Sequence, residues 1–76
     1  AERGYAKAQF NLGVMYHEGA GVPQDLVLTH MWFNLAAAAG RQDAEEKREL
    51  VAARMTPDQI AEAQRMAQDW WAKRKQ

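Results

Sequence analysis

Apolar residues recur along the chain with the spacing of α-helices, so each helix is expected to bury one face. Ala8, Leu12 and Tyr16 lie four residues apart and predict a helix over residues 5–18, with these three side chains turned toward the next helix. Gly19 stands where a C-terminal cap is expected, and residues 21–23, with a glycine and a proline, cannot continue the helix. A helix followed by a tight turn is therefore predicted.

The second helix is predicted over residues 25–39, with Asp25 as its N-cap and Gly40 at its end. We expect Trp32 to be its largest buried side chain and to fill the space between neighbouring helix pairs. The predicted face is Leu28, Trp32, Leu35, Ala36 and Ala39. Met31, Trp32 and Phe33 project about 100° apart, so a single face cannot bury all three. Either this helix is flanked on two sides, or one of the three forms a contact surface.

Two more helices follow. The third is predicted over residues 43–54, with Ala44 and Val51 directed inward. Around Pro57, Thr56 and Gln59 have the spacing of a capping box that opens the fourth helix. Its buried stripe is expected to be Ile60, Ala63, Ala67, Trp70 and Trp71.

A short motif occurs twice. Gly4 to Ala8 and Gly40 to Ala44 both read Gly-x-x-x-Ala, and both ends are offset by 36 residues, since 40 − 4 and 44 − 8 each give 36. The similarity decays after Ala44. It is either an accidental match in an alanine-rich chain or a degenerate terminal repeat that caps a stack, and we favour the cap. Small side chains at Ala8, Gly13 and Ala36 are expected to let paired helices approach closely.

A longer pattern resembles a known family. The residues that carry it are the run 8–16, then Gly19, Gly21, Val22, Asp25, Trp32, Ala36, Ala37 and Gly40. This pattern resembles the Sel-one-like repeat (SLR) family, a relative of the tetratricopeptide repeats (TPR). Thr29 departs from the alanine that the family prefers, and residues 55–70 resemble the C-terminal end common in bacterial members.

The resemblance implies an all-α fold, an α/α superhelix of two antiparallel helix hairpins. Residues 1–76 would be one domain, with a complete repeat over about 4–40 and a degenerate capping helix pair over 41–76. It also implies a scaffold or adaptor for protein complexes that has no catalytic activity. A small hydrolase, as described for cysteine-rich relatives, and a purely structural fragment of a longer solenoid are the alternatives.

Composition agrees with helices. Alanine supplies 15 residues, whereas valine, isoleucine and threonine together supply seven, which disfavours a sheet. The formal net charge is zero, so we expect neither nucleic acid nor an anionic membrane surface as a partner. The chain has no cysteine and starts at Ala1 rather than at methionine, as expected of a trimmed or processed chain. Both a cytoplasmic and an exported location fit.

No residues have the spacing of a catalytic or metal site. His17 and His30 are not in metal-ligand spacing; we expect His30 to be solvated and His17 to have a capping or inter-helix role. The five consecutive charges of residues 45–49 surround their helix, and serine is absent. The basic residues 73–75 complement a helix dipole. We therefore expect no enzyme, metal or cofactor.

The candidate site is a surface that binds a protein or peptide. Polar positions of the first helix, and the positions 36 residues later, are expected to line a concave groove of mixed charge. They are Lys7, Asn11, Glu18, Asp43, Lys47 and Arg54. The alternative is that these six are ordinary solvated positions. Near the end of the chain, Trp70 and Trp71, with Met66, predict a second surface through which the chain self-associates at high concentration.

Overall fold

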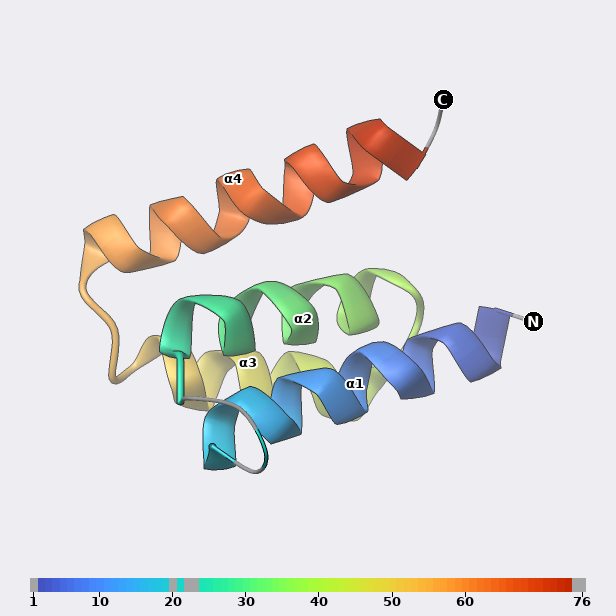
Figure 1. The fold of residues 1–76 in the computed structure, drawn as a ribbon, viewed down its shortest axis with the longest axis horizontal. Coiled ribbons are helices and arrows are strands. Elements are labelled where there is room, and N and C mark those ends of the chain that lie inside the picture. Colours follow the sequence, from blue (N-terminus) through green and yellow to red (C-terminus); the bar gives the residue numbers. More distant parts are fainter. Residues whose placement is uncertain (1, 20, 22–23, 75–76) are drawn as a thin grey trace.

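The structure, a computed structural model, describes residues 2–19, 21 and 24–74. Within these ranges the chain forms four helices and no strand: α1 (Glu2–Glu18), α2 (Leu26–Ala38), α3 (Gln42–Ala52) and α4 (Pro57–Arg74). Successive helices run in opposite directions (Figure 1). The predicted all-α class is confirmed. Val22 and Pro23 of the predicted turn, and Lys75 of the basic end, lie outside the described residues.

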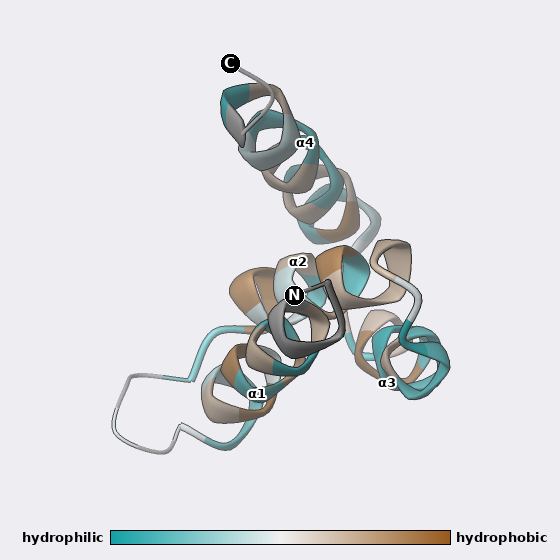
Figure 2. Cartoon of the chain, turned by 90° about the vertical axis from the view of Figure 1, so that its right-hand side faces the viewer, coloured by the Kyte–Doolittle hydropathy of each residue, from teal (hydrophilic) through white to brown (hydrophobic). Residues whose placement is uncertain are grey.

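Helix α2 is the centre of the fold. It lies between α4 on one side and α1 with α3 on the other, as Figures 1 and 2 show from two directions. Helices α3 and α4 each contact α2 far more than they contact each other. A helix enclosed in this way buries side chains on several sides, unlike a surface helix with one apolar face. Its buried residues are Thr29, His30, Met31, Phe33, Leu35 and Ala36.

This central position decides between the two alternatives for residues 31–33. Met31 and Phe33 are both buried, and Trp32 is half-buried, so the helix is flanked on two sides. Trp32 lies between the helix pairs, as expected, with its ring centroid 6.3 Å from that of Trp70. It is not enclosed, however, and Phe33 and Leu35 are more deeply buried.

The predicted helix ends are confirmed by their hydrogen bonds. The backbone N–H of Leu28 donates to Asp25 Oδ1 over 3.1 Å, so Asp25 caps α2. At α4, the Thr56 N–H donates to Gln59 Oε1 and the Gln59 N–H donates to Thr56 Oγ1, which completes the capping box. Gly19 and Gly40, beyond the ends of α1 and α2, have φ of 71° and 102°. Only a residue without a β-carbon adopts these angles at low cost.

Thr29 shows how a polar residue replaces the expected alanine. Its side chain is fully buried on α2. The hydroxyl donates to the backbone oxygen of Asp25 over 2.6 Å, one turn earlier in the chain. Because the buried hydroxyl is hydrogen-bonded to its own helix, threonine can replace alanine at position 29 without a partner from another helix.

Helices α1 and α2 approach most closely where Gly13 meets Phe33. A β-carbon placed on residue 13 would lie 2.6 Å from two carbons of the Phe33 ring. Phe10 packs on the same ring, with the two centroids 5.3 Å apart. Of the small residues predicted to line this interface, Gly13 does so, Ala36 is fully buried on α2, and Ala8 does not line it because it is exposed.

The predicted inward face of α1 is thus wrong. Leu12 and Tyr16 are only half-buried, like neighbouring side chains at a helix margin, and the buried positions are Ala6, Gln9 and Gly13. The observed buried face is rotated about 100° around the helix axis from the predicted one, which corresponds to a shift of one residue. The reason is steric: α1 can rest on the Phe33 ring only where it carries no side chain, so the glycine sets the interface rather than the leucine.

The second helix pair follows the prediction more closely. Ala44 and Val51 of α3 are buried, and so are Ala63 and Ala67 of α4. Trp71 is the exception, because 39% of it is exposed. One residue beyond Trp70, it projects about 100° away from the stripe that faces α2.

Replacing Gly13 with alanine is expected to destabilise the fold. Alanine favours helix over glycine by about 1 kcal/mol, whereas forcing a methyl group into a packed site costs about 1–3 kcal/mol. With the Phe33 ring only 2.6 Å from the added carbon, we expect steric overlap to dominate. Urea denaturation followed by circular dichroism should show a net loss of about 1–2 kcal/mol.

The matched control is the same change in a Phe33→Leu background. Leucine removes the aromatic edge that the methyl group would meet, so the cost of Gly13→Ala should fall by at least about half. An equal cost in both backgrounds, or a Gly13→Ala variant more stable than the wild type, would contradict the close approach.

Candidate functional site

A groove opens between α1 and α3, and α2 forms its floor. The cavity has a volume of about 230 Å³. Its lining combines apolar side chains with a few charged or polar ones at the margin. The lining residues are Val14, His17, Glu18, Phe33, Lys47, Leu50 and Val51. Helices α1 and α3 run in the same direction (Figure 1).

The wall on α1 consists of Val14, His17 and Glu18, near the C-terminal end of that helix. With Gly13 against α2, helical geometry places Val14 and His17 on one flank, and that flank turns toward α3. The end of α1 is held in place by hydrogen bonds. Gln24 Nε2 donates to the His17 carbonyl over 2.8 Å, and the Asp25 N–H donates to the Tyr16 carbonyl over 3.1 Å.

The wall on α3 consists of Lys47, Leu50 and Val51. Val51 is buried against the core, but 64% of Leu50 is exposed, more than of any other large hydrophobic side chain in the described ranges. Leu50 follows five consecutive charged residues in the sequence, on a helix whose outer side is hydrophilic (Figure 2). The fold therefore does not require a leucine at this position.

A polar contact holds the α3 wall in position from the opposite flank. Arg48 Nη1 donates to Asn34 Oδ1 of α2 over 2.8 Å, in a partly buried position. This bond lies between Ala44 and Val51 along α3, on the flank that faces α2. It fixes the rotation of α3 about its axis and thereby directs Lys47 and Leu50 to the groove.

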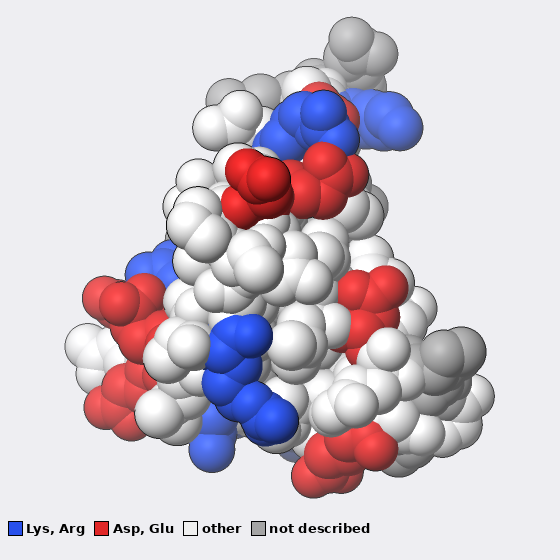
Figure 3. Space-filling view, turned by 90° about the vertical axis from the view of Figure 1, so that its left-hand side faces the viewer, with Lys and Arg blue, Asp and Glu red and all other residues white. Residues whose placement is uncertain are grey.

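The structure brings together two of the six polar residues predicted for the groove. Glu18 and Lys47 stand on opposite walls of this one cavity. Lys7, Asn11 and Arg54 are exposed but do not line it. Seen from the end where α1 and α3 finish, basic and acidic side chains are interspersed rather than segregated (Figure 3).

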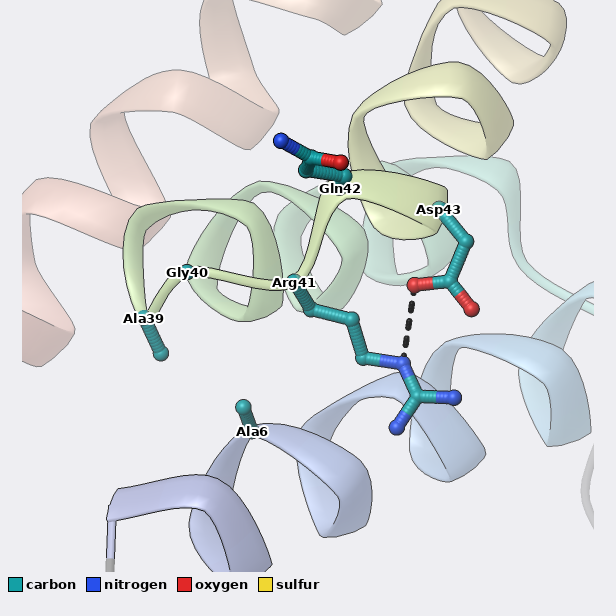
Figure 4. Close-up of a pocket in the computed structure, with 6 residues that line it drawn as sticks. All are labelled: Ala6, Ala39, Gly40, Arg41, Gln42 and Asp43. Carbon is teal, nitrogen blue, oxygen red and sulfur yellow. Dashed lines mark hydrogen bonds and ion pairs between the residues drawn. The ribbon is translucent and has the colours of Figure 1, made fainter.

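Asp43 belongs to a different hollow at the start of α3. This cavity, of about 480 Å³, is lined by Ala6, Asp43 and residues 39–42 (Figure 4). Arg41 Nε lies 2.9 Å from Asp43 Oδ1, and the guanidinium carbon lies 4.4 Å from the centre of the Phe10 ring. Both contacts satisfy the arginine charge within the chain. They tie the start of α3 to α1, which is a structural role.

The two C-terminal tryptophans differ in their surroundings. Trp70 packs edge to face between Trp32 and Trp71, with ring centroids 6.3 Å and 5.3 Å away. It also joins the core cluster that contains Leu35. Trp71 is the exposed member of this aromatic group, so the predicted second surface depends on Trp71 rather than on the pair.

The apolar part of the groove, formed by Val14, Leu50 and Phe33, does not follow from the helical pattern of the sequence. A signal was nevertheless present at position 50. Leu50 lies about 100° from the Ala44–Val51 stripe of its helix, so a leucine there was already known to be off the buried face.

His30 is buried, contrary to the prediction that it is solvated. Only 3% of it is exposed, and its Nδ1 atom has no hydrogen-bond partner among the described residues. The prediction failed because it assumed one buried face on α2, whereas α2 is enclosed by three helices. Burial lowers the pKa of His30 below its ordinary value of 6.5, Arg48 lowers it further, and Glu49 opposes the shift.

The described residues hold no group of three histidine, cysteine, aspartate or glutamate side chains placed to bind a metal. Several carboxylates there form ion pairs with nearby arginines, as Glu62 does with Arg65 and Glu49 with Arg48. None of the helices within the described ranges has the length and apolar character needed to cross a membrane.

The fold and the groove define a helical repeat protein of the TPR-like class, in which the first helices of successive pairs line a common surface. Residues 6–40, most of α1 together with α2, match the family model of the Sel1 repeat. This match confirms the SLR resemblance over residues 6–40. Sel1 repeats are in general non-catalytic modules for protein interaction. No curated protein matches the chain.

The buried His30 predicts that acid destabilises the fold. The unfolded chain binds a proton on this imidazole at higher pH than the folded chain does. The free energy of unfolding should therefore be fully retained above about pH 6.5 and decrease as the pH falls through that value. Urea denaturation at pH 7.5 and pH 5.5 measures the difference.

Two variants separate His30 from other titrating groups. His30→Leu should lose most of the difference between the two pH values, because leucine binds no proton. His17→Gln keeps His30 and should keep the difference. The same decrease in His30→Leu as in the wild type would show that another group is responsible.

Proposed function

We propose that the groove between α1 and α3 is the surface by which this module binds a protein partner. The observation that carries the proposal is Leu50, a large apolar side chain exposed at the mouth of a cavity that the fold does not fill. Isolated exposed leucines are common on protein surfaces. This one adjoins Val14 and the Phe33 ring, so the apolar surface is continuous.

The arrangement of the groove supports the same conclusion. Apolar side chains form its centre, whereas Glu18 and Lys47 stand at its margin. An apolar centre with a polar rim is the usual composition of a specific binding surface. Helical repeat proteins commonly bind a peptide or a helix of the partner in such a groove.

For residues 41–76 we propose the role of a terminal pair. Helix α4 buries Ala63 and Ala67 against α2 and carries charged residues on its other sides, as a helix that ends a stack does. In this role α3 completes the groove and α4 covers α2.

Trp71 supports a second candidate function, self-association through α4. Trp71 is 39% exposed and lies beside the edge-to-face pair of Trp32 and Trp70. Aromatic side chains are enriched at protein interfaces. A hollow lined by Met31, Met66, Asp69, Trp70 and Lys73 lies on the other flank of α4.

Leu50→Ala tests the groove. Peptides are first selected from a random phage-displayed library on the immobilised chain, and their binding is then mapped by amide chemical shifts. Peptides that bind the groove should shift the amides of Val14 and Leu50. Leu50→Ala should weaken their binding about tenfold, because a buried leucine side chain contributes about 1.5–3 kcal/mol.

The stability of this variant should be nearly unchanged, within about 0.5 kcal/mol, because Leu50 is exposed. The matched control is Met15→Ala, which truncates another exposed apolar side chain, one that does not line the groove. It should leave peptide binding unchanged. Selected peptides that shift only α4 amides, or equal losses in both variants, would place the docking surface elsewhere.

Trp71→Lys tests self-association. If α4 is a contact surface, sedimentation velocity should show a concentration-dependent dimer for the wild type and a monomer for the variant. Leu50→Ala is the control and should still dimerise. A wild type that stays monomeric at millimolar concentration would exclude this function.

A further inference from the structure

We infer that the groove selects a peptide segment with one large apolar side chain flanked by an acidic residue on one side and a basic residue on the other. This inference rests on the proposed function and specifies its ligand. The acidic residue would face Lys47 on the α3 wall, and the basic residue would face Glu18 on the α1 wall. The apolar side chain would lie between them, against Val14, Leu50 and the Phe33 ring.

Lys47 and Glu18 are the two side chains with a formal charge at pH 7 that line the groove. Within the described ranges, neither takes part in an ion pair, whereas Arg48, which follows Lys47, pairs with Glu49. These two charges flank the apolar centre and are available to a ligand.

Glu18 also stands where its own helix disfavours it. It is the last residue of α1, and the C-terminal end of a helix dipole carries partial negative charge. The partial negative charge of this helix end repels a carboxylate and attracts a cation. A basic side chain from a ligand would be attracted by the carboxylate and by the helix end together.

The size of the groove limits the apolar part of the ligand. A cavity of about 230 Å³ is below the range of about 300–1,000 Å³ typical of drug-sized ligands. It suits one large side chain rather than several. On the α3 wall, Lys47 and Val51 are four residues apart, which corresponds to about 6 Å along a helix. A charged residue within a few positions of the apolar anchor can therefore reach Lys47.

The test exchanges the charges at the groove. Random peptide libraries are selected in parallel, at pH 7.5 and low salt, on the wild type, on Lys47→Glu and on Glu18→Lys. The readout is the charge of the residues that flank the enriched apolar anchor. The wild type should enrich one acidic and one basic flank. Lys47→Glu, with two acidic walls, should enrich two basic flanks, and Glu18→Lys should enrich two acidic flanks.

Affinity provides the second measurement. A wild-type peptide should bind each variant about three- to tenfold more weakly at low salt, because each reversal replaces one exposed attraction with a repulsion. The difference should shrink in 0.5 M salt, where charges are screened within a few ångströms. Both side chains are exposed, so neither reversal should lower the melting temperature appreciably, and Glu18→Lys should raise it slightly because it places a cation at the C-terminal end of α1.

The outcomes separate the two proposals. Suppose that all three proteins select the same flanking charges while the peptides still shift the Val14 and Leu50 amides. This result would contradict the proposed selection of flanking charges but support the groove as the docking surface. If no selected peptide shifts these amides, both the proposed docking surface and the proposed selection of flanking charges are contradicted. Exchange of the flanking charges as described, with the amide shifts in place, supports both.

Discussion

The packing of the Phe33 ring holds the helices of this domain in their arrangement. The ring lies against Gly13 of α1, where a single β-carbon would overlap it, and Phe10 packs on it as well. In the same core cluster are Val51 from α3 and Ala63 from α4. One side chain of α2 thus belongs to a core built from all four described helices, and the closeness of α1 to α2 depends on a glycine that leaves room for it.

The same ring forms the floor of the groove. Because Gly13 faces α2, the next residue, Val14, is rotated about 100° toward α3 and becomes part of the groove wall. On α3, Val51 faces the core, and Leu50, one residue earlier, projects about 100° away from it toward the groove. Core packing therefore fixes which side chains face the groove, although the exposed residues of its wall, Lys47 and Leu50, contribute little to stability.

Features set by neighbouring residues could be predicted from the sequence, whereas features set by distant ones could not. The Asp25 cap, the capping box at Thr56 and the glycine helix ends depend on a few adjacent residues, and all are observed. The burial of His30 and the inward face of α1 depend on α2 being surrounded by three helices. That Glu18 and Lys47 would line one groove was accessible, because the 36-residue offset placed both among its expected polar residues, but the apolar centre between them was not.

On α3, the residues that hold the helix to α2 and the residues proposed to bind a partner lie on different flanks. One flank carries Ala44, Val51 and the Arg48–Asn34 bond, which hold the helix to α2. The other carries Lys47 and Leu50, which are exposed and unnecessary to that attachment. A change on the second flank can therefore alter what the groove binds while the fold persists. In a repeat domain with so thin a core, this separation lets the binding surface vary without loss of the few contacts on which folding depends.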